Sequence, residues 1–209
     1  MTTLLIGHRG VAGKYPENTK ASIQAAIDMG LHWVEVDVQP TKDNVLVVCH
    51  DHTVNRCSNG RGRVDQMTLS ELRTLDFGRW FSDEFVNESI MTLSELLELA
   101  AENNLNLNIE VKVDHHSAED VAQIVAQTLS ESPLAHERIL LSSFSHDVIR
   151  ALHKHCTGYR LGVLSEFFTR QDKLLLEEVN AYSCNLNINW VRSRQINKLQ
   201  QAGYKVMCY

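Results

Sequence analysis

The sequence is short of the features that mark several common classes of protein. Its five cysteines are odd in number and form no Cys-x-x-Cys pair, so we expect neither a disulfide framework nor a zinc site. It has no run of lysine or arginine and a formal net charge of −6, which argues against nucleic acids and anionic membranes as partners. It also lacks an apolar stretch long enough for a bilayer span or a secretory signal, which predicts a cytoplasmic protein without stable membrane association.

Signatures of nucleotide and acyl chemistry are absent as well. The chain has no Gly-x-Gly-x-x-Gly loop, no Walker loop and no Gly-x-Ser-x-Gly elbow, so nucleotide transfer and serine hydrolysis lack support. The composition, with 44% hydrophobic and 22% charged residues in 209, is typical of one globular domain with a sizeable core. We therefore expect residues 1–209 to form a single domain that acts on a small ligand.

Hydrophobic periodicity predicts an α/β fold. An apolar strand over residues 4–7 leads through a glycine turn to a helix capped by Asn18 or Thr19, and strand 33–38 follows. From residue 92 onward helices and strands alternate strictly, which indicates parallel strands. The predicted helices are 93–103, 117–130, 146–155, 170–179 and 192–202, and the predicted strands are 105–113, 138–143, 160–164, 183–188 and 204–208.

Polar residues on one face of these strands indicate a barrel. Strand 105–113 alternates apolar residues with four polar ones, and strand 183–188 alternates them with two asparagines. Strands covered by helices on both faces are usually apolar throughout, so this pattern predicts a TIM-type (β/α)8 barrel whose lumen holds a site. Seven barrel strands precede the end of the sequence, so we expect the closing elements to be missing and the sheet edges to stay open.

Two segments interrupt the alternation. Strand 45–49 follows strand 33–38 after a turn too short for a parallel crossover, so we interpret it as a hairpin strand outside the barrel. Residues 52–90 carry their own apolar and aromatic content, which predicts an insertion and not a linker. Capping-box sequences beginning at Thr68 and Thr92 predict two helix starts.

Three acidic residues on predicted strands are candidate metal ligands. Glu35 and Asp37 share one face of strand 33–38, roughly 6.5 to 7 Å apart at Cα, and Glu110 lies on the polar face of strand 105–113. Three carboxylates suit Mg²⁺ or Ca²⁺. The alternative for Glu35 and Asp37 alone is a solvated acidic strand face.

Two histidines and two cations accompany these acids. His8 and His50 each end an apolar strand and could serve as an acid and a base, although either alone could be a structural histidine. Asp51 could orient the ring of His50 or simply begin the next turn. Arg9 and Lys112 could bind phosphate oxygens or pair with the acids, and these two interpretations are compatible.

The order of the motifs resembles that of the glycerophosphodiester phosphodiesterase family. The motifs are His8-Arg9-Gly10, Pro16-Glu17-Asn18-Thr19, Glu35-Val36-Asp37, His50-Asp51 and Glu110-Val111-Lys112, and they span nearly the whole chain. The resemblance implies a (β/α)8 barrel with a small insertion after the His-Asp motif. It also implies metal-dependent hydrolysis of a small glycerophosphodiester to sn-glycerol 3-phosphate and an alcohol.

The resemblance further implies a role for each candidate residue. Glu35, Asp37 and Glu110 would bind the metal, His8 and His50 would be the acid/base pair, and Arg9 with Lys112 would bind the phosphate. Two departures from the family pattern stand out: Met91 replaces a proline, and Tyr209 stands where the family's Trp-Thr-Val-Asn segment begins. The first should alter only how the insertion rejoins the barrel, whereas the second bears on barrel closure and the substrate pocket.

Alternatives remain open at this point. The nucleophile could be water or the substrate's own glycerol 2-hydroxyl. The same residues could serve a lysophospholipase or phosphoinositide phospholipase, which an exposed apolar rim would favour. The chain could also be a noncatalytic phosphodiester-binding barrel.

Overall fold

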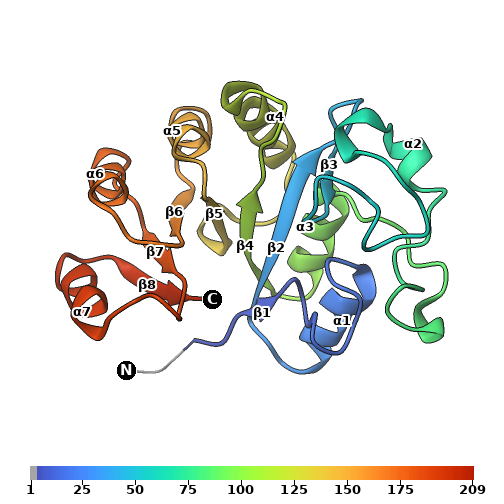
Figure 1. The fold of residues 1–209 in the computed structure, drawn as a ribbon, viewed down its shortest axis with the longest axis horizontal. Coiled ribbons are helices and arrows are strands. Elements are labelled where there is room, and N and C mark those ends of the chain that lie inside the picture. The colour runs from blue at the N-terminus through green and yellow to red at the C-terminus, as the bar shows by residue number, and fades with distance from the viewer. Residues whose placement is uncertain (1–3) are drawn as a thin grey trace.

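The computed structural model describes residues 4–209 and shows a strongly curled parallel sheet with helices on its outer side (Figure 1). Seven parallel strands follow the order β1-β2-β4-β5-β6-β7-β8. They are β1 (Gly7–His8), β2 (Trp33–Pro40), β4 (Asn106–Val111), β5 (Ile139–Ser143), β6 (Arg160–Ser165), β7 (Ser183–Leu186) and β8 (Lys205–Cys208). Within the described chain β1 pairs only with β2, and β8 only with β7, so the sheet is an open half-barrel.

Six helices alternate with these strands and cover the sheet. They are α1 (Lys20–Asp28), α3 (Leu93–Glu102), α4 (Ala118–Ser130), α5 (His146–His155), α6 (Arg170–Glu178) and α7 (Ser193–Gln201). Thr19 caps α1 by accepting a hydrogen bond from the Ser22 amide, and Thr92 begins α3 with the predicted capping box. The predicted TIM-type α/β fold, its seven strands and its open edges are confirmed.

Several predicted strand boundaries were wrong, and the predicted strand 105–113 corresponds to β4, which ends at Val111. Residues 4–6 lie outside β1, where Leu4 and Leu5 are 52% and 70% exposed, because nothing in residues 4–209 pairs with the far side of this edge. Ile188 lies beyond β7 and is exposed. A turn at Asn187, whose side chain accepts a hydrogen bond from the Asn189 amide, ends that strand.

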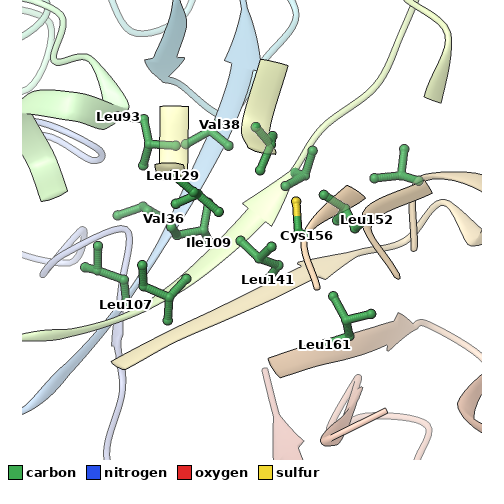
Figure 2. Packing of buried hydrophobic residues seen from close by; sticks show 14 of the residues in the cluster. Val36, Val38, Leu93, Leu107, Ile109, Leu129, Leu141, Leu152, Cys156 and Leu161 are labelled. Atoms are coloured by element: carbon green, nitrogen blue, oxygen red, sulfur yellow. The ribbon is translucent and has the colours of Figure 1, made fainter. Parts of the chain in front are cut away.

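The two faces of the central strands have different roles: one packs in the hydrophobic core and the other carries the polar residues of the site. On the outer face, apolar side chains of β2, β4 and β5 pack under the helices (Figure 2). The fully buried ones include Val34, Val36, Val38, Leu107, Ile109 and Leu141. The intervening residues of β2 and β4 belong to the opposite, concave face. On that face the strand register sets Asp37 beside Glu110.

The chain leaves the barrel after β2, as predicted. Strand β3 (Leu46–Val48) runs antiparallel to β2, and residues 52–90 follow it with helix α2 (Leu69–Leu72) and two short 3-10 helices, Val64–Gln66 and Asp83–Phe85. The insertion has a hydrophobic cluster of its own, formed by Val47, Cys49, Val54, Val64, Leu72, Phe77 and Ile90. Because this cluster includes β3 and Cys49, the insertion is packed directly beside His50.

Candidate active site

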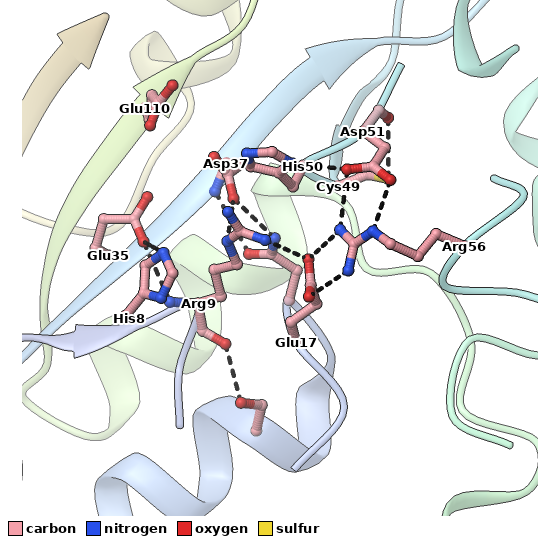
Figure 3. A network of polar contacts seen from close by, with 12 residues as sticks. His8, Arg9, Glu17, Glu35, Asp37, Cys49, His50, Asp51, Arg56 and Glu110 are labelled. Carbon is pink, nitrogen blue, oxygen red and sulfur yellow. Dashed lines mark hydrogen bonds and ion pairs between the residues drawn. The ribbon is translucent and has the colours of Figure 1, made fainter. Parts of the chain in front are cut away.

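Three carboxylates converge on the concave side of the sheet, where Glu35 and Asp37 of β2 lie beside the C-terminal ends of β1 and β4. Oxygen atoms of Glu35, Asp37 and Glu110 all lie within 4.8 Å of one another (Figure 3). The side chains are mostly withdrawn from water: Asp37 is 1% exposed and Glu110 is 8% exposed. The parallel register of β2 and β4 causes this convergence, because it places Asp37 directly opposite Glu110.

The electrostatics of this group favour a bound cation. Burial and the neighbouring charges of Asp37 and Glu110 raise the pKa of Glu35 well above its ordinary value. Burial, with a contribution from Asp37, also raises the pKa of Glu110. Buried like charges repel one another unless a positive ion lies among them, and three carboxylates are the oxygen donors that Mg²⁺ and Ca²⁺ prefer.

Lys112 is one positive group beside these acids. It follows the end of β4, and its Nζ lies 3.0 Å from Asp37 Oδ1 and also contacts Glu110 Oε1. Burial alone would lower the pKa of Lys112, but the two carboxylates outweigh burial and raise it. The predicted ion pairing of Lys112 is therefore present.

Arg9 is the second cation, held in a tight loop after β1. Its backbone has a positive φ of 49°, and its amide donates a hydrogen bond of 3.1 Å to Glu35 Oε2. Its guanidinium donates to Glu17 Oε1 at 2.7 Å and lies 3.3 Å from Asp37 Oδ2 through Nε. That Nε is buried and makes no hydrogen bond to the described residues, which leaves it able to donate to a ligand oxygen.

Asn18 holds Asp37 in place, a role that the sequence reasoning missed. We expected Asn18 or Thr19 to cap the first helix, and Thr19 does so. Asn18 instead has a positive φ of 57°, is 5% exposed, and donates a 3.0 Å hydrogen bond from Nδ2 to Asp37 Oδ2. Its position in the Pro16–Thr19 motif was the available signal.

His50 reaches the site from the end of the β3 hairpin. Its Nδ1 lies 2.7 Å from Asp51 Oδ1, so Asp51 orients the ring. Because a carboxylate only accepts hydrogen bonds, Nδ1 carries the proton and Nε2 of the neutral ring is an acceptor. Gln39 of β2 fixes this turn by donating from Nε2 to the backbone oxygens of Cys49 and Asp51.

His8 lies on the other side of the carboxylates. Its Nε2 is 3.9 Å from Glu35 Oε2, and 65% of its side chain is exposed. Partial desolvation of the ring and the adjacent Arg9 cation lower the pKa of His8, and the charge of His50 contributes in the same direction. All seven predicted site residues thus lie at the same end of the sheet.

The sequence reasoning also missed Glu17 and Arg56, which extend the network beyond the predicted residues (Figure 3). Glu17 accepts hydrogen bonds from both Arg9 and Arg56, and Arg56 also donates to Asp51. These bonds outweigh the effect of burial and lower the pKa of Glu17. The hydrogen bond from Arg56 likewise lowers the pKa of Asp51. Glu17 stands in a motif singled out above, whereas Arg56 carried no signal.

Comparison with known proteins identifies the family of the chain. The model of the glycerophosphoryl diester phosphodiesterase family matches residues 8–209. A glycerophosphodiester phosphodiesterase of Caldanaerobacter subterraneus subsp. tengcongensis is 38% identical over 164 residues, which cover 78% of this chain and 67% of that protein. One from Bacillus altitudinis is 33% identical over 187 residues, covering 89% of this chain and 76% of that protein.

A solved structure agrees with the fold over nearly the whole chain. It is that of an Oleispira antarctica phosphodiesterase in complex with its product sn-glycerol-3-phosphate, with a TM-score of 0.93 and 28% identity. The match covers 99% of this chain and 84% of that one. Within the described residues of this chain, no helix combines the length and apolarity needed to cross a bilayer.

Proposed function

Because the chain belongs to the glycerophosphoryl diester phosphodiesterase family, we propose that it hydrolyses glycerophosphodiesters to sn-glycerol 3-phosphate and an alcohol, with a divalent cation. The observation that carries the proposal is the meeting of three largely buried carboxylates with Arg9 and Lys112 at the C-terminal ends of the parallel strands β1 and β4. Barrel enzymes have their active sites at this end of the sheet.

Glu35, Asp37 and Glu110 would hold the cation, Mg²⁺ or Ca²⁺. Their oxygens lie within 4.8 Å of one another, and burial together with the neighbouring carboxylates raises the pKa values of Glu35 and Glu110. When bound, such a cation polarises a phosphoryl oxygen and offsets charge that develops during the reaction. Asn18 keeps Asp37 in the orientation that this binding requires.

Arg9 and Lys112 would bind the other oxygens of the phosphate. Arg9 has a buried Nε without a hydrogen-bond partner in residues 4–209, and Lys112 has an ammonium group between Asp37 and Glu110. Charge-assisted hydrogen bonds from such groups are stronger than neutral ones, and they strengthen further as negative charge grows on the phosphoryl group.

His50 and His8 would move the protons. With its Nδ1 proton donated to Asp51, His50 has a free Nε2 that can take the proton of the nucleophile as the new P–O bond forms. His8, whose lowered pKa makes its protonated ring a stronger acid, would give that proton to the alkoxide as the P–O bond to the alcohol breaks. An alkoxide is too basic to leave readily without that proton.

The nucleophile is either water or the glycerol 2-hydroxyl. Attack by the hydroxyl first forms a cyclic phosphate, which water then opens to glycerol 3-phosphate. Trapping the cyclic phosphate would select this route. Incorporation of solvent oxygen in one step, with inversion at phosphorus, would select direct attack by water.

The decisive experiment measures choline and glycerol 3-phosphate released from glycerophosphocholine, with and without a chelator. We expect release that stops in chelator and returns with Mg²⁺ or Ca²⁺. A matched control is Asp65→Asn, which should leave activity and its metal dependence unchanged. Asp65 belongs to a second cluster of possible metal ligands, with Asp114 and His115, and both of its acids already pair with Arg63. Full activity in chelator would remove the metal role, and no activity with any diester would favour a noncatalytic binder.

A second candidate substrate, a lysophospholipid or phosphoinositide, is favoured by one observation. Large aromatic residues that follow β5 to β8 are exposed: Phe144, Phe167, Trp190 and Tyr209. They form two contacting pairs, Phe144 with Tyr209 and Phe167 with Trp190, whose ring centroids lie 5.8 Å and 5.2 Å apart. If this rim binds acyl chains, Trp190→Ala will lower kcat/KM for lysophosphatidylcholine but not for glycerophosphocholine.

A further inference from the structure

Arg56, which lies in the insertion, connects the proposed base, His50, with the proposed phosphate-binding residue, Arg9 (Figure 3). One edge of its guanidinium faces Asp51: Nε donates to Oδ2 at 2.8 Å and Nη2 donates to Oδ1 at 2.9 Å. Asp51 in turn lies 2.7 Å from Nδ1 of His50. A continuous chain of hydrogen bonds therefore runs from Arg56 to the proposed base.

The other edge of the same guanidinium faces Glu17. Nη1 donates to Glu17 Oε2 at 2.7 Å, and Nη2 donates to Oε1 at 2.8 Å. Glu17 Oε1 also accepts a 2.7 Å hydrogen bond from Arg9. The Glu17 side chain is only 11% exposed, whereas the Arg56 side chain is 44% exposed, so Arg56 contacts the largely buried Glu17 from the solvent side.

We propose that Arg56 is a positioning residue for the hydrolysis, which holds His50 through Asp51 and Arg9 through Glu17. This inference rests on the proposed function. Arg56 would act through Asp51 and Glu17, to which its guanidinium donates, and not by binding the phosphate itself. Its effect is to keep the proton acceptor and a phosphate-binding cation in fixed orientations relative to each other.

The planar fork of arginine explains why this position needs arginine. The guanidinium places three nitrogens in one plane, and here all three donate to carboxylate oxygens, with Nη2 donating to both acids. A lysine ammonium carries a similar charge but cannot present two parallel pairs of donors to two acids at once.

The charge distribution gives the network a second role. Glu17 shares its negative charge between Arg9 and Arg56. If Arg56 were removed, Glu17 would pair with Arg9 alone and would compete more strongly with a phosphate for that guanidinium. Loss of Arg56 should therefore weaken phosphate binding as well as release the ring of His50.

The insertion fixes the backbone that carries Arg56. The neighbouring Val54 is fully buried in the insertion's hydrophobic cluster, and its amide donates to the Gly62 carbonyl at 3.0 Å. Ser58 donates from Oγ to the Val54 carbonyl at 2.7 Å, which closes the turn around Arg56. The insertion thus supports the catalytic machinery from outside the barrel.

The test compares Arg56→Gln and Arg56→Lys with Arg63→Gln. Arg63 is a matched control because it is an insertion arginine that also binds two acids, Asp65 and Asp114, but its hydrogen bonds do not lead to His50. With glycerophosphocholine, we expect Arg56→Gln to lower kcat by about 10- to 100-fold, as loss of a group supporting a site residue typically does, and to raise KM. Arg56→Lys should restore part of KM but little of kcat, and Arg63→Gln should change neither by more than about twofold.

Two further measurements separate positioning from folding. Metal-induced thermal stabilisation should be the same in all variants, because Arg56 makes no contact with the three carboxylates. The ¹⁵N shifts of His50 should indicate a proton fixed on Nδ1 in the wild type and Arg63→Gln, and a mixture of tautomers in Arg56→Gln.

The inference is overturned if Arg56→Gln keeps kcat and the wild-type His50 tautomer, or if it loses metal-induced stabilisation. A wild-type protein without diesterase activity would instead reject the proposed function. The ring-nitrogen comparison would still decide whether Arg56 positions His50.

Discussion

The two halves of the curled sheet use the same sequence pattern for different purposes. In both, several strands, such as β2, β4 and β7, alternate polar with apolar residues and turn the polar ones to the concave side. In the half from β1 to β4 three of these polar residues are acids that crowd together: Glu35, Asp37 and Glu110. In the half from β5 to β8 the buried polar residues of the strands, such as Ser142, Ser183 and Asn185, are neutral, and some satisfy one another, as Ser183 does by donating to Asn185 at 2.9 Å.

This difference shows what polar alternation indicates and what it does not. A neutral buried pair that is hydrogen-bonded is stable without a ligand, whereas crowded buried carboxylates need a counter-ion. The alternation therefore locates the lumen of the barrel, but only unbalanced charge locates the site within it. The second half offers exposed aromatic residues at its strand ends instead, including Phe167 and Trp190.

The largest expected effect comes from removing one charge of the first half. Glu35→Gln should weaken metal binding and lower kcat/KM together, by on the order of 10³-fold, because the metal's share of transition-state stabilisation is several kcal/mol. Calorimetric metal titration and a choline-release assay measure the two effects. Unchanged metal affinity would refute the assignment of Glu35 as a ligand.

The second-largest effect should come from His50→Ala and should change kcat but not metal affinity. His50→Ala should lower kcat by about 10²- to 10⁴-fold, since it removes a general base, while metal affinity stays at the wild-type value. The same two measurements apply. A parallel loss of metal affinity would mean that His50 supports the carboxylates and would remove the distinction between the two roles.

A smaller effect should appear when pH is varied. The raised pKa values of Glu35 and Glu110 favour their protonated forms, so the stability they lend to the metal-free protein is present at low pH and falls as pH rises above about 4.5 and through the raised values. Metal binding displaces these protons, so metal affinity should rise by up to about tenfold per pH unit for each proton displaced in that window.

Calorimetric titrations across this pH range measure the change in metal affinity. The comparison with Glu35→Gln sharpens the result, because the variant has lost one of the two shifted groups and should show a shallower pH dependence. A pH-independent affinity in the wild type would contradict the crowding of charge described here.

The smallest catalytic effect should come from the neutral half. Ser142 of β5 donates a 2.9 Å hydrogen bond to Asn108, and both side chains are buried. Ser142→Ala should lower the free energy of unfolding by about 1 to 3 kcal/mol, because Asn108 loses a partner, yet leave kcat within about twofold. Chemical denaturation and the choline-release assay test this contrast. A loss of activity comparable to that of His50→Ala would show that the neutral half takes part in the chemistry.

Regular strands were the part that the sequence predicted well. The period of two in β2 and β4 is local, and it determined which residues of each strand share a face, including Glu35, Asp37 and Glu110. The hairpin and the insertion were also predictable, because turn length and apolar content are local properties. The edges of the sheet were not, since the end of β1 depends on which strands lie beside it.

Residues outside the regular elements were harder to predict. Arg56 lies in an irregular segment and contacts Glu17, 39 residues earlier in the chain, so no periodicity relates them. The contact of Asn18 with Asp37 was missed because asparagine and threonine are both common helix caps and stand next to each other here, so the sequence left either as the cap. The positive φ of Asn18 and its hydrogen bond to Asp37 are seen only in the three-dimensional structure.

Because of strand β3, the acids and His50 are carried by separate parts of the chain. The acids stand on parallel strands whose spacing is set by the sheet, whereas the imidazole of His50 arrives on a separate hairpin that Gln39 fastens to β2. Sequence changes in residues 52–90 would therefore adjust the proposed proton acceptor, His50, while the register between Asp37 and Glu110 stays as it is. Substitutions in the insertion alone would then change the proposed proton transfer at His50 and leave the proposed cation ligands, Glu35, Asp37 and Glu110, unchanged.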